Sequence, residues 1–439
     1  MEEKNKLVYS LREKPNKKYL LIYTLQWWLV MISSNIFYPL ILGKELGFTP
    51  LQLVAMSNRS LFFAGVFSLI QGLWGYKLPV MDGLASIWVS VYVLIFQIGG
   101  KAGNVENAMQ QIEGIMIMCG IIVTILAITG MMGRIKKLFT PLIAGSLLIL
   151  LSLQLSGNFM RGMLGIKDGV VSIGTICVSL LILAVMIFLL YWAKPKIRSL
   201  AALLGLLVGW GLMLISGQAP FQMTLVSDGS LLSIPQIFPW GLPIFSLAGF
   251  VNAAFMSIVV ISNQFTSSLC VADACKEELT DERFKQGGLV NGIAHIVTGA
   301  FASIGTIPYA SSGAFIEVTK VATIYPYLGA CMLLIIGSLT WQLGSFFGNI
   351  PAAVTYAVAF AMFTQLIGMG IKNYLRIELN ERSLLIIGFT LMTGVGVMFV
   401  PSDAFQFLPG IIRNIVSNGL LMGTLVGLTL EHLAFRKKH

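Results

Sequence analysis

The chain has 439 residues, of which 56% are hydrophobic and only 11% are charged. A soluble globular domain carries about 25% charged residues, so the composition excludes an ordinary soluble protein and indicates a polytopic membrane protein. The formal net charge of +10 does not indicate nucleic-acid binding, because the basic residues gather in alternate loops between apolar runs.

The apolar runs recur often enough to predict about 14 membrane-spanning segments, each close to the roughly 20 residues that cross the hydrocarbon. The predicted segments cover residues 20–42, 51–74, 79–98, 112–132, 138–157, 171–192, 199–217, 242–264, 287–303, 306–321, 323–347, 352–371, 383–400 and 410–434. The fold class is therefore an all-α polytopic membrane protein.

Lys and Arg gather before the first segment and in alternate loops after it, such as Arg134 to Lys137 and Lys194 to Arg198. This positive-inside pattern predicts a multi-pass protein of the cell membrane with both termini in the cytoplasm, which requires an even number of segments. The five cysteines show no paired spacing, so we expect neither disulfides nor a metal site.

Two predicted segments, the third and the tenth, are interrupted by Gly, Pro and polar residues. Pro79 is followed at plus three by Asp82, and Pro308 is followed at plus three by Ser311. In a bilayer, backbone groups freed by such a break must face protein or a water-filled cavity. A Pro-rich linker over 218–241 divides the chain into two sets of seven, so the halves are expected to be inverted repeats with a binding site at the two breaks.

The eighth segment ends in a polar run, SNQFTSS. On a helix, Asn263 and Ser267 share a face, so an amide and a hydroxyl can point at one ligand. A polar helix end near the cytoplasmic interface is the alternative. Arg59 lies about two turns from the outer end of the second segment, where we expect it to snorkel to the interface.

Two acidic residues are candidates for the group that couples transport to an ion. Asp82 lies beside the first break, and Glu317 lies in the tenth segment, where a local ion pair with Lys320 is the alternative. Enzyme signatures such as a Walker motif, GxSxG and HExxH are missing from the sequence. We therefore expect no enzyme and no cofactor, and active transport would be driven by an ion gradient, with a proton as the first choice and sodium as the second.

Several stretches resemble the nucleobase-ascorbate transporter family, the symporters of the xanthine and uracil permease type. They include LQWWL in the first segment, KLPVMDGLASIW at the third, LFTPLIAGSLL at the fifth, LVNGIAHIVTGAFASIG before the tenth, SSGAFIEVTKV within it, and LPGIIRNIVSNGLLMG in the last. The resemblance implies 14 segments in two inverted seven-segment repeats, with short strands in segments 3 and 10 and the substrate between those strands and segment 8.

The resemblance also implies a division into a core domain and a gate domain. The tails cover 1–19 and 435–439, the core covers 20–132 and 242–347, the gate covers 133–217 and 348–434, and the external linker covers 218–241.

Carried over residue by residue, the family's substrate site falls on neutral side chains in this sequence. The substrate-binding candidates are Asn263, Ser267, Ser311, Ser312 and Ser86. The family usually has carboxylates among these positions, and it usually has an uncharged residue where this chain has Asp82. The resemblance implies uptake of a purine or pyrimidine nucleobase.

Two other interpretations stay open. One is an anion transporter of the sulfate-permease type with the same fold, and the other is a non-transporting membrane sensor that has lost the usual carboxylates. The expected partners are a nucleobase and membrane lipid but no nucleic acid, and the sequence leaves a homodimer open.

Overall fold

The computed structural model describes residues 7–99, 105–133, 140–166, 170–219, 230, 232–405, 407–408 and 416–434. Parts of the predicted tails (1–6 and 435–439), most of the predicted linker (220–229 and 231) and the start of the last predicted segment (410–415) lie outside the described residues.

The described chain is mainly helical. Its helices are α1 (Lys17–Asn35), α2 (Phe37–Glu45), α3 (Pro50–Leu73), α4 (Ser86–Gly99), α5 (Val105–Ile128), α7 (Pro141–Leu164), α8 (Ile173–Tyr191), α9 (Pro195–Arg198), α10 (Ala201–Ile215), α11 (Leu247–Cys275), α12 (Asp281–Ala300), α13 (Ser311–Thr319), α14 (Ile324–Ser338), α15 (Trp341–Gly348), α16 (Ala352–Tyr374), α17 (Glu381–Met398), η3 (Ser402–Phe405), α19 (Gly419–Thr429) and η4 (Leu430–Ala434). Within the described ranges, 8 helical stretches are long and apolar enough to cross a membrane, counting α1 and α2 as one.

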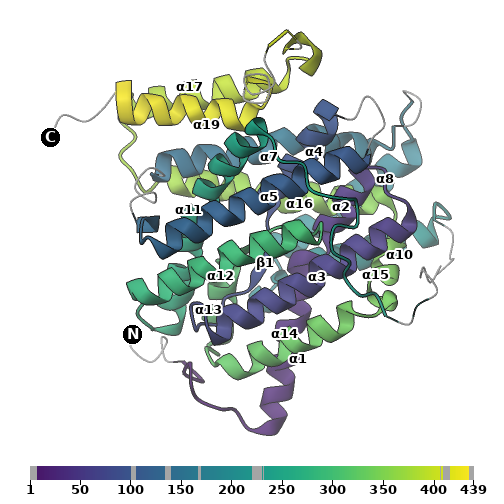
Figure 1. Cartoon of the computed structure of the whole chain (residues 1–439). Coiled ribbons are helices and arrows are strands. Elements are labelled where there is room, and N and C mark those ends of the chain that lie inside the picture. The colour runs from purple at the N-terminus through teal and green to yellow at the C-terminus, as the bar shows by residue number, and fades with distance from the viewer. Residues whose placement is uncertain are drawn as a thin grey trace.

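Two short strands lie at the centre of the molecule, where β1 is visible in Figure 1. Strand β1 (Asp82–Leu84) pairs antiparallel with β2 (Thr306–Pro308), and Gly83 lies opposite Ile307. Both strands are buried, and each leads directly into a helix, α4 or α13. Because the strands are antiparallel, the chain leaves the pair in opposite directions.

Side chains from other elements complete the hydrogen bonding around β1. The Met81 amide donates to Ser312 Oγ over 3.0 Å, and the Asp82 amide donates to Ser68 Oγ over 2.9 Å. The Leu84 amide donates to Asn35 Oδ1 over 2.7 Å. A buried backbone amide without a partner is costly, so these three side chains allow extended chain to exist inside a helical bundle.

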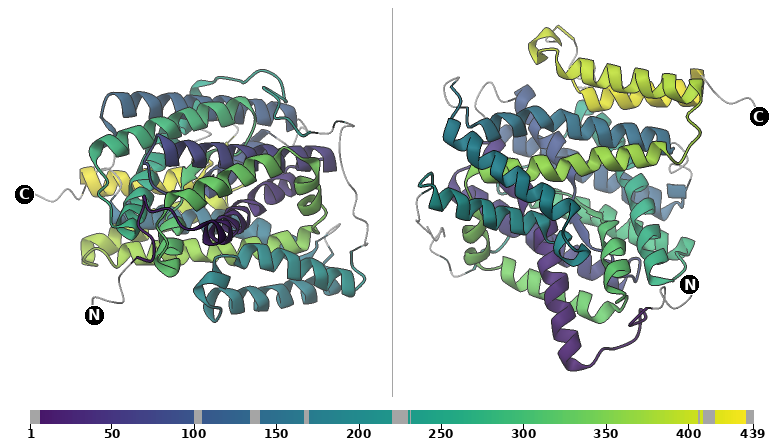
Figure 2. Two further views of the ribbon diagram at one scale, coloured as in Figure 1. Left: turned by 90° about the horizontal axis from the view of Figure 1, so that it is seen from below. Right: turned by 180° about the vertical axis from the view of Figure 1, so that it is seen from behind.

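The helices pack in two groups, which we name by their members. In the strand group, α3 packs on β1 and α14, α5 packs on α11 and α12, and α13 packs on α11. In the α7–α16 group, α7 packs on α16, α17 and α19, and α8 packs on α10 and α16. Helices α17 and α19 lie together on one side of the molecule and α1 and α14 lie on the opposite side, as Figures 1 and 2 show.

The expectation that Arg59 reaches the membrane interface is wrong. Its side chain is buried, with 7% of the residue exposed, and Nε donates to the carbonyl oxygen of Ala302 over 2.8 Å. Ala302 has a φ of +48° and follows the end of α12, where helix carbonyls lack partners within the helix. Arg59 therefore stabilises the connection from α12 to β2 instead of snorkelling.

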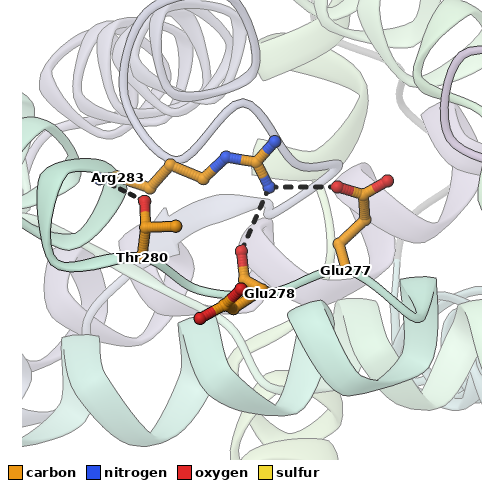
Figure 3. Close-up of polar contacts among 4 residues, drawn as sticks. All are labelled: Glu277, Glu278, Thr280 and Arg283. Carbon is orange, nitrogen blue, oxygen red and sulfur yellow. Dashed lines mark hydrogen bonds and ion pairs between the residues drawn. The ribbon is translucent and has the colours of Figure 1, made fainter.

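The eighth predicted segment is longer than expected, because α11 continues to Cys275. After it, the Thr280 side chain accepts a hydrogen bond from the Arg283 amide at the start of α12 (Figure 3). Arg283 Nη1 also lies 3.2 Å from Glu277 Oε2 and donates to the carbonyl oxygen of Glu278. Because α11 continues to Cys275, the polar run from Ser262 to Ser268 lies inside a helix and not at a helix end.

Candidate substrate site

A cavity of about 550 Å³ lies between the two helix groups. Helices α11 and α13 contribute one part of its lining, and α7 and α16 contribute the other. Small-molecule sites typically measure 300–1,000 Å³ and combine apolar walls with a few polar groups. The size and lining therefore fit a small organic ligand.

The structure brings the two α11 candidates together in this cavity. Both Asn263 and Ser267 line it, and the Ser267 hydroxyl lies 3.4 Å from Asn263 Oδ1. Their separation of four residues places them on one face of α11, and the continuation of the helix to Cys275 holds that face rigid. A neutral amide both donates and accepts hydrogen bonds, so this pair can read a ligand with mixed polar edges.

The three other substrate-binding candidates are not among the residues that line the cavity. Ser312 is buried, and its hydroxyl accepts a hydrogen bond from the Met81 amide. Ser311 is exposed at the start of α13, and Ser86 is half-buried at the start of α4. The sequence pattern located the strand breaks, but the direction of each side chain depends on tertiary packing.

The two coupling candidates occupy different environments. Asp82 is fully buried behind the strand pair, and its Oδ1 accepts a hydrogen bond from Asn291 Nδ2 over 3.4 Å. Glu317 is exposed and lines the cavity. Among the salt bridges of the described residues, none joins Glu317 to Lys320.

Sequence reasoning missed the charged lining of the cavity. Asp273 and Glu317 come from the strand group, whereas Lys372 and Arg376 come from the last turn of α16 and the residues after it. In the sequence, the two basic residues belong to one of the alternate basic stretches between apolar runs. Lys372 lies in the last turn of α16 and Arg376 follows directly after the helix, so their closeness in the sequence was the signal that could have assigned them to a common surface.

A second cavity of about 480 Å³ lies at the other end of the same helix pair. Its lining includes Arg161 near the C-terminal end of α7 and Tyr356 near the N-terminal end of α16, together with Glu45 at the end of α2. The first cavity uses Leu147 of α7 and Met369 of α16. Helices α7 and α16 therefore line two separate cavities along their length.

A bundle of apolar helices with a buried strand pair, and with cavities between two groups of helices, is the arrangement expected of a multi-pass membrane protein that transports a solute. A sequence model of the xanthine/uracil permease family, described as "Permease family", matches residues 18–403. The chain belongs to this family, which confirms the resemblance seen in its sequence.

The chain is similar over nearly its whole length to named permeases. It is 27% identical to the putative purine permease YwdJ of Bacillus subtilis, covering 94% of this chain and 95% of the relative. It is 27% identical to the uric acid permease PucK of the same organism, covering 98% of each. It is 25% identical to the xanthine permease XanP of Escherichia coli, covering 98% of this chain and 95% of the relative.

Solved membrane transporters share the fold. The transmembrane domain of the cyanobacterial bicarbonate transporter BicA has a TM-score of 0.61 at 14% identity, covering 94% of this chain and 97% of that chain. The murine anion transporter Slc26a9 in its inward-facing state has a TM-score of 0.64 at 10% identity, covering 96% of this chain and 69% of that chain. At these identities the similarity establishes the fold alone.

Proposed function

We propose that this protein is a proton-coupled transporter that takes up a purine or pyrimidine nucleobase across the cell membrane, with both termini in the cytoplasm. The observation that carries the proposal is the cavity that holds Asn263 and Ser267 between the two helix groups. The family relationship and the permeases of purines, uric acid and xanthine among the relatives support a nucleobase as the substrate.

The two helix groups support a division into a moving core and a gate. The members of the strand group fall within the proposed core, 20–132 and 242–347, and those of the α7–α16 group fall within the proposed gate, 133–217 and 348–434. In the proposed architecture of two inverted seven-segment repeats, β1 and β2 occupy equivalent segments. Alternating access then consists of a rigid-body movement of the core along α7 and α16, which opens one cavity while it closes the other.

The chemistry of the cavity favours a planar heterocycle. Asn263 offers an N–H donor and a carbonyl acceptor, and Ser267 offers a hydroxyl that can do either. The apolar residues Val259, Leu147 and Met369 line the same cavity and can cover the faces of a ring. A nucleobase has both features, because its edge alternates donors and acceptors and its faces are apolar.

Asp82 is the proposed coupling group. It is a buried carboxyl group in the strand that faces the centre of the molecule, and its Oδ2 atom has no hydrogen-bond partner among the described residues. Burying an ionised carboxylate without a cation is expensive, so a proton can neutralise this group during part of the cycle. Glu317 is a weaker candidate because it is exposed to the cavity.

Cys270 provides a direct test of ligand binding, because it lines the cavity one turn beyond Thr266. Cys177 is the exposed cysteine, and Cys119, Cys275 and Cys331 are buried. In a Cys177→Ser protein, a methanethiosulfonate reagent is expected to modify Cys270, and xanthine, urate, guanine, hypoxanthine or uracil should slow the modification. Bicarbonate and sulfate should not, and protection by these anions alone would favour the anion-transporter interpretation.

Uptake into proteoliposomes tests transport itself. The labelled base that protects Cys270 is expected to accumulate under an inward proton gradient. A protonophore should reduce this accumulation. An Asp82→Asn variant should still bind the base but should not accumulate it, whereas Glu278→Gln, an exposed acid in the α11–α12 loop, should behave as the parent. Full pH-dependent accumulation by Asp82→Asn would exclude Asp82 as the coupling group, and a requirement for a sodium gradient would exclude the proton.

A further inference from the structure

Asn291 of α12 joins the strand pair to the helix that carries the substrate candidates. Its Nδ2 atom donates to the carbonyl oxygen of Thr306 in β2 over 2.9 Å and to Asp82 Oδ1 in β1 over 3.4 Å. Its Oδ1 atom accepts from Gln264 Nε2 of α11 over 2.6 Å. All four residues are fully buried. One amide group therefore contacts β1, β2 and α11.

The surrounding groups fix the orientation of this amide. The Thr306 carbonyl oxygen only accepts hydrogen bonds, and so does an ionised Asp82 carboxylate. The Asn291 NH₂ group must face them, and its oxygen atom is then directed to the Gln264 NH₂ group. An amide in the opposite orientation would place its oxygen against two acceptors.

Gln264 connects this network to the cavity. It directly follows Asn263, and α11 directs Asn263 to the cavity while Gln264 is buried against α12. A change in the position of Asn291 therefore acts on the backbone of α11 at the residue next to the substrate candidate. Loss of a hydrogen bond in a low-dielectric interior is costly, so the helix and the amide move together.

The charge of Asp82 decides how strongly it holds Asn291. Gln71, Asn291 and Thr306 lie around the carboxyl group, and all three are neutral. An ionised carboxylate accepts hydrogen bonds only, whereas a protonated one also donates and is a weaker acceptor. Asp82 Oδ2 and Thr306 Oγ1 have no hydrogen-bond partner among the described residues, so Oδ2 is the free position for the proton.

Among the residues that the structure describes, the other titratable groups near this carboxyl are three tyrosines and a histidine. Tyr76, Tyr309 and Tyr327 come from the α3–β1 connection, the end of β2 and α14. His295 lies one turn after Asn291, and its Nδ1 atom is 2.9 Å from the Asn291 carbonyl oxygen. A His295→Gln variant, which cannot titrate, separates its contribution from that of Asp82.

We propose that Asn291 is a positioning residue that transmits the charge state of Asp82 through Gln264 to the substrate-facing side of α11. The consequence is that the affinity for the transported base depends on pH. The identity of the base as the ligand rests on the proposed function, but the coupling between Asp82 and α11 does not.

The first test measures the base concentration that gives half-protection of Cys270 in Cys177→Ser protein, at intervals between about pH 5 and about pH 9. This range includes the titration of histidine and of carboxyl groups at buried positions. In the parent protein, the base concentration that gives half-protection should change by about tenfold across this range, which corresponds to a coupling of about 1.4 kcal/mol. Asn291→Ala and Gln264→Leu should bind with little dependence on pH, and so should Asp82→Asn. His295→Gln should retain the parental dependence.

Thr298→Ala is the matched control, because Thr298 is a buried polar residue of α12 whose hydroxyl donates to Ala294 of its own helix over 2.7 Å. It should keep the parental pH dependence. Parental pH dependence in Asn291→Ala would overturn the proposal. If Asn291→Ala does not fold, Gln264→Leu carries the same test from the other end of the network.

A second test needs no ligand and remains decisive if no base binds. The melting temperatures of Asp82→Asn, Gln264→Leu and the double variant form a cycle between two side chains that both hydrogen-bond to Asn291. The effects should be non-additive with Asn291 present, and the non-additivity should disappear in Asn291→Ala protein. Additive effects in both backgrounds would overturn the coupling. A lack of base protection at every pH in the parent would instead reject the proposed substrate class.

Discussion

Ser146 of α7 and Tyr374 of α16 share a buried hydrogen bond, with 2.9 Å between their hydroxyl oxygens. Beside it the two helix backbones approach closely, because a Cβ atom added at Gly145 would lie 2.8 Å from the carbonyl oxygen of Gly370. The reverse distance, from a Cβ at Gly370 to the Gly145 carbonyl oxygen, would be 2.7 Å. Helices α7 and α16, which line both cavities, therefore form one rigid unit.

We expect Gly145→Ala to destabilise the protein. The added methyl group meets backbone atoms that cannot rotate away, and overpacking of this kind costs about 1–3 kcal/mol. A lower melting temperature of purified protein would measure this cost. Gly368→Ala, in α16 with no atom within 4 Å of the added carbon, should be neutral or slightly stabilising because Ala favours a helix over Gly. Equal melting temperatures for the two variants would contradict the close approach.

Asn263→Ala should weaken the binding of the base that protects Cys270. Loss of hydrogen bonds inside a cavity costs about 1–3 kcal/mol, which corresponds to an increase in Kd of roughly 5-fold to 150-fold. Equilibrium binding to detergent-solubilised protein measures this change. Ser257→Ala is the control, because Ser257 is a buried residue of α11 whose hydroxyl donates to Ala253 of the same helix over 2.7 Å. Similar losses for both variants would place the ligand elsewhere.

Ser312→Ala should reduce stability more than affinity. The Ser312 hydroxyl accepts from the Met81 amide, and its removal leaves a buried N–H group without a partner, at a cost of about 1–3 kcal/mol. Thermal unfolding measures the loss, and Ser311→Ala on the exposed neighbour should change little. A large increase in Kd for Ser312→Ala, with an unchanged melting temperature, would instead indicate that Ser312 binds the substrate.

Arg376→Glu should slow transport by about 1.4-fold to fivefold, which is the range of the 0.2–1 kcal/mol found for exposed ion pairs. Arg376 lines the first cavity with Glu317, so reversal of one charge places two acids on surfaces that move relative to each other. The double variant Glu317→Arg with Arg376→Glu restores opposite charges and should recover much of the initial uptake rate. An additive loss in the double variant would show that the two residues act separately.

The broken segments were predictable from local chemistry, because Pro79 and Pro308 interrupt apolar runs that are otherwise continuous. The face shared by Asn263 and Ser267 follows from helix periodicity alone, and the structure places both in one cavity. The extension of α11 to Cys275 was not predictable from hydropathy, since the polar run from Ser262 to Ser268 interrupts the apolar pattern before the helix ends.

Contacts between distant segments account for what the sequence could not provide. Asn291 is separated from Asp82 by 209 residues along the chain, and no local pattern marks either as a partner of the other. Ser312 follows a strand break, and the sequence therefore predicted a ligand contact. Its hydrogen bond with the Met81 amide depends on tertiary packing, which brings β1 beside it. Lys372 and Arg376 fit the positive-inside pattern of basic loops, so their positions in the sequence did not indicate that they line a cavity.

The hydrogen bond from Arg59 to Ala302 joins residues 243 positions apart. At 5–20 residues per second, the ribosome adds Ala302 about 12 to 50 seconds after Arg59. During this interval α3 must enter the bilayer before Ala302 exists to accept from its guanidinium group, at an insertion cost that reaches about 2.5–3.5 kcal/mol for an arginine at mid-membrane. The early helices therefore depend on the translocon or on neighbouring helices until the second half of the chain is made, and the two halves mature as a single unit during biogenesis.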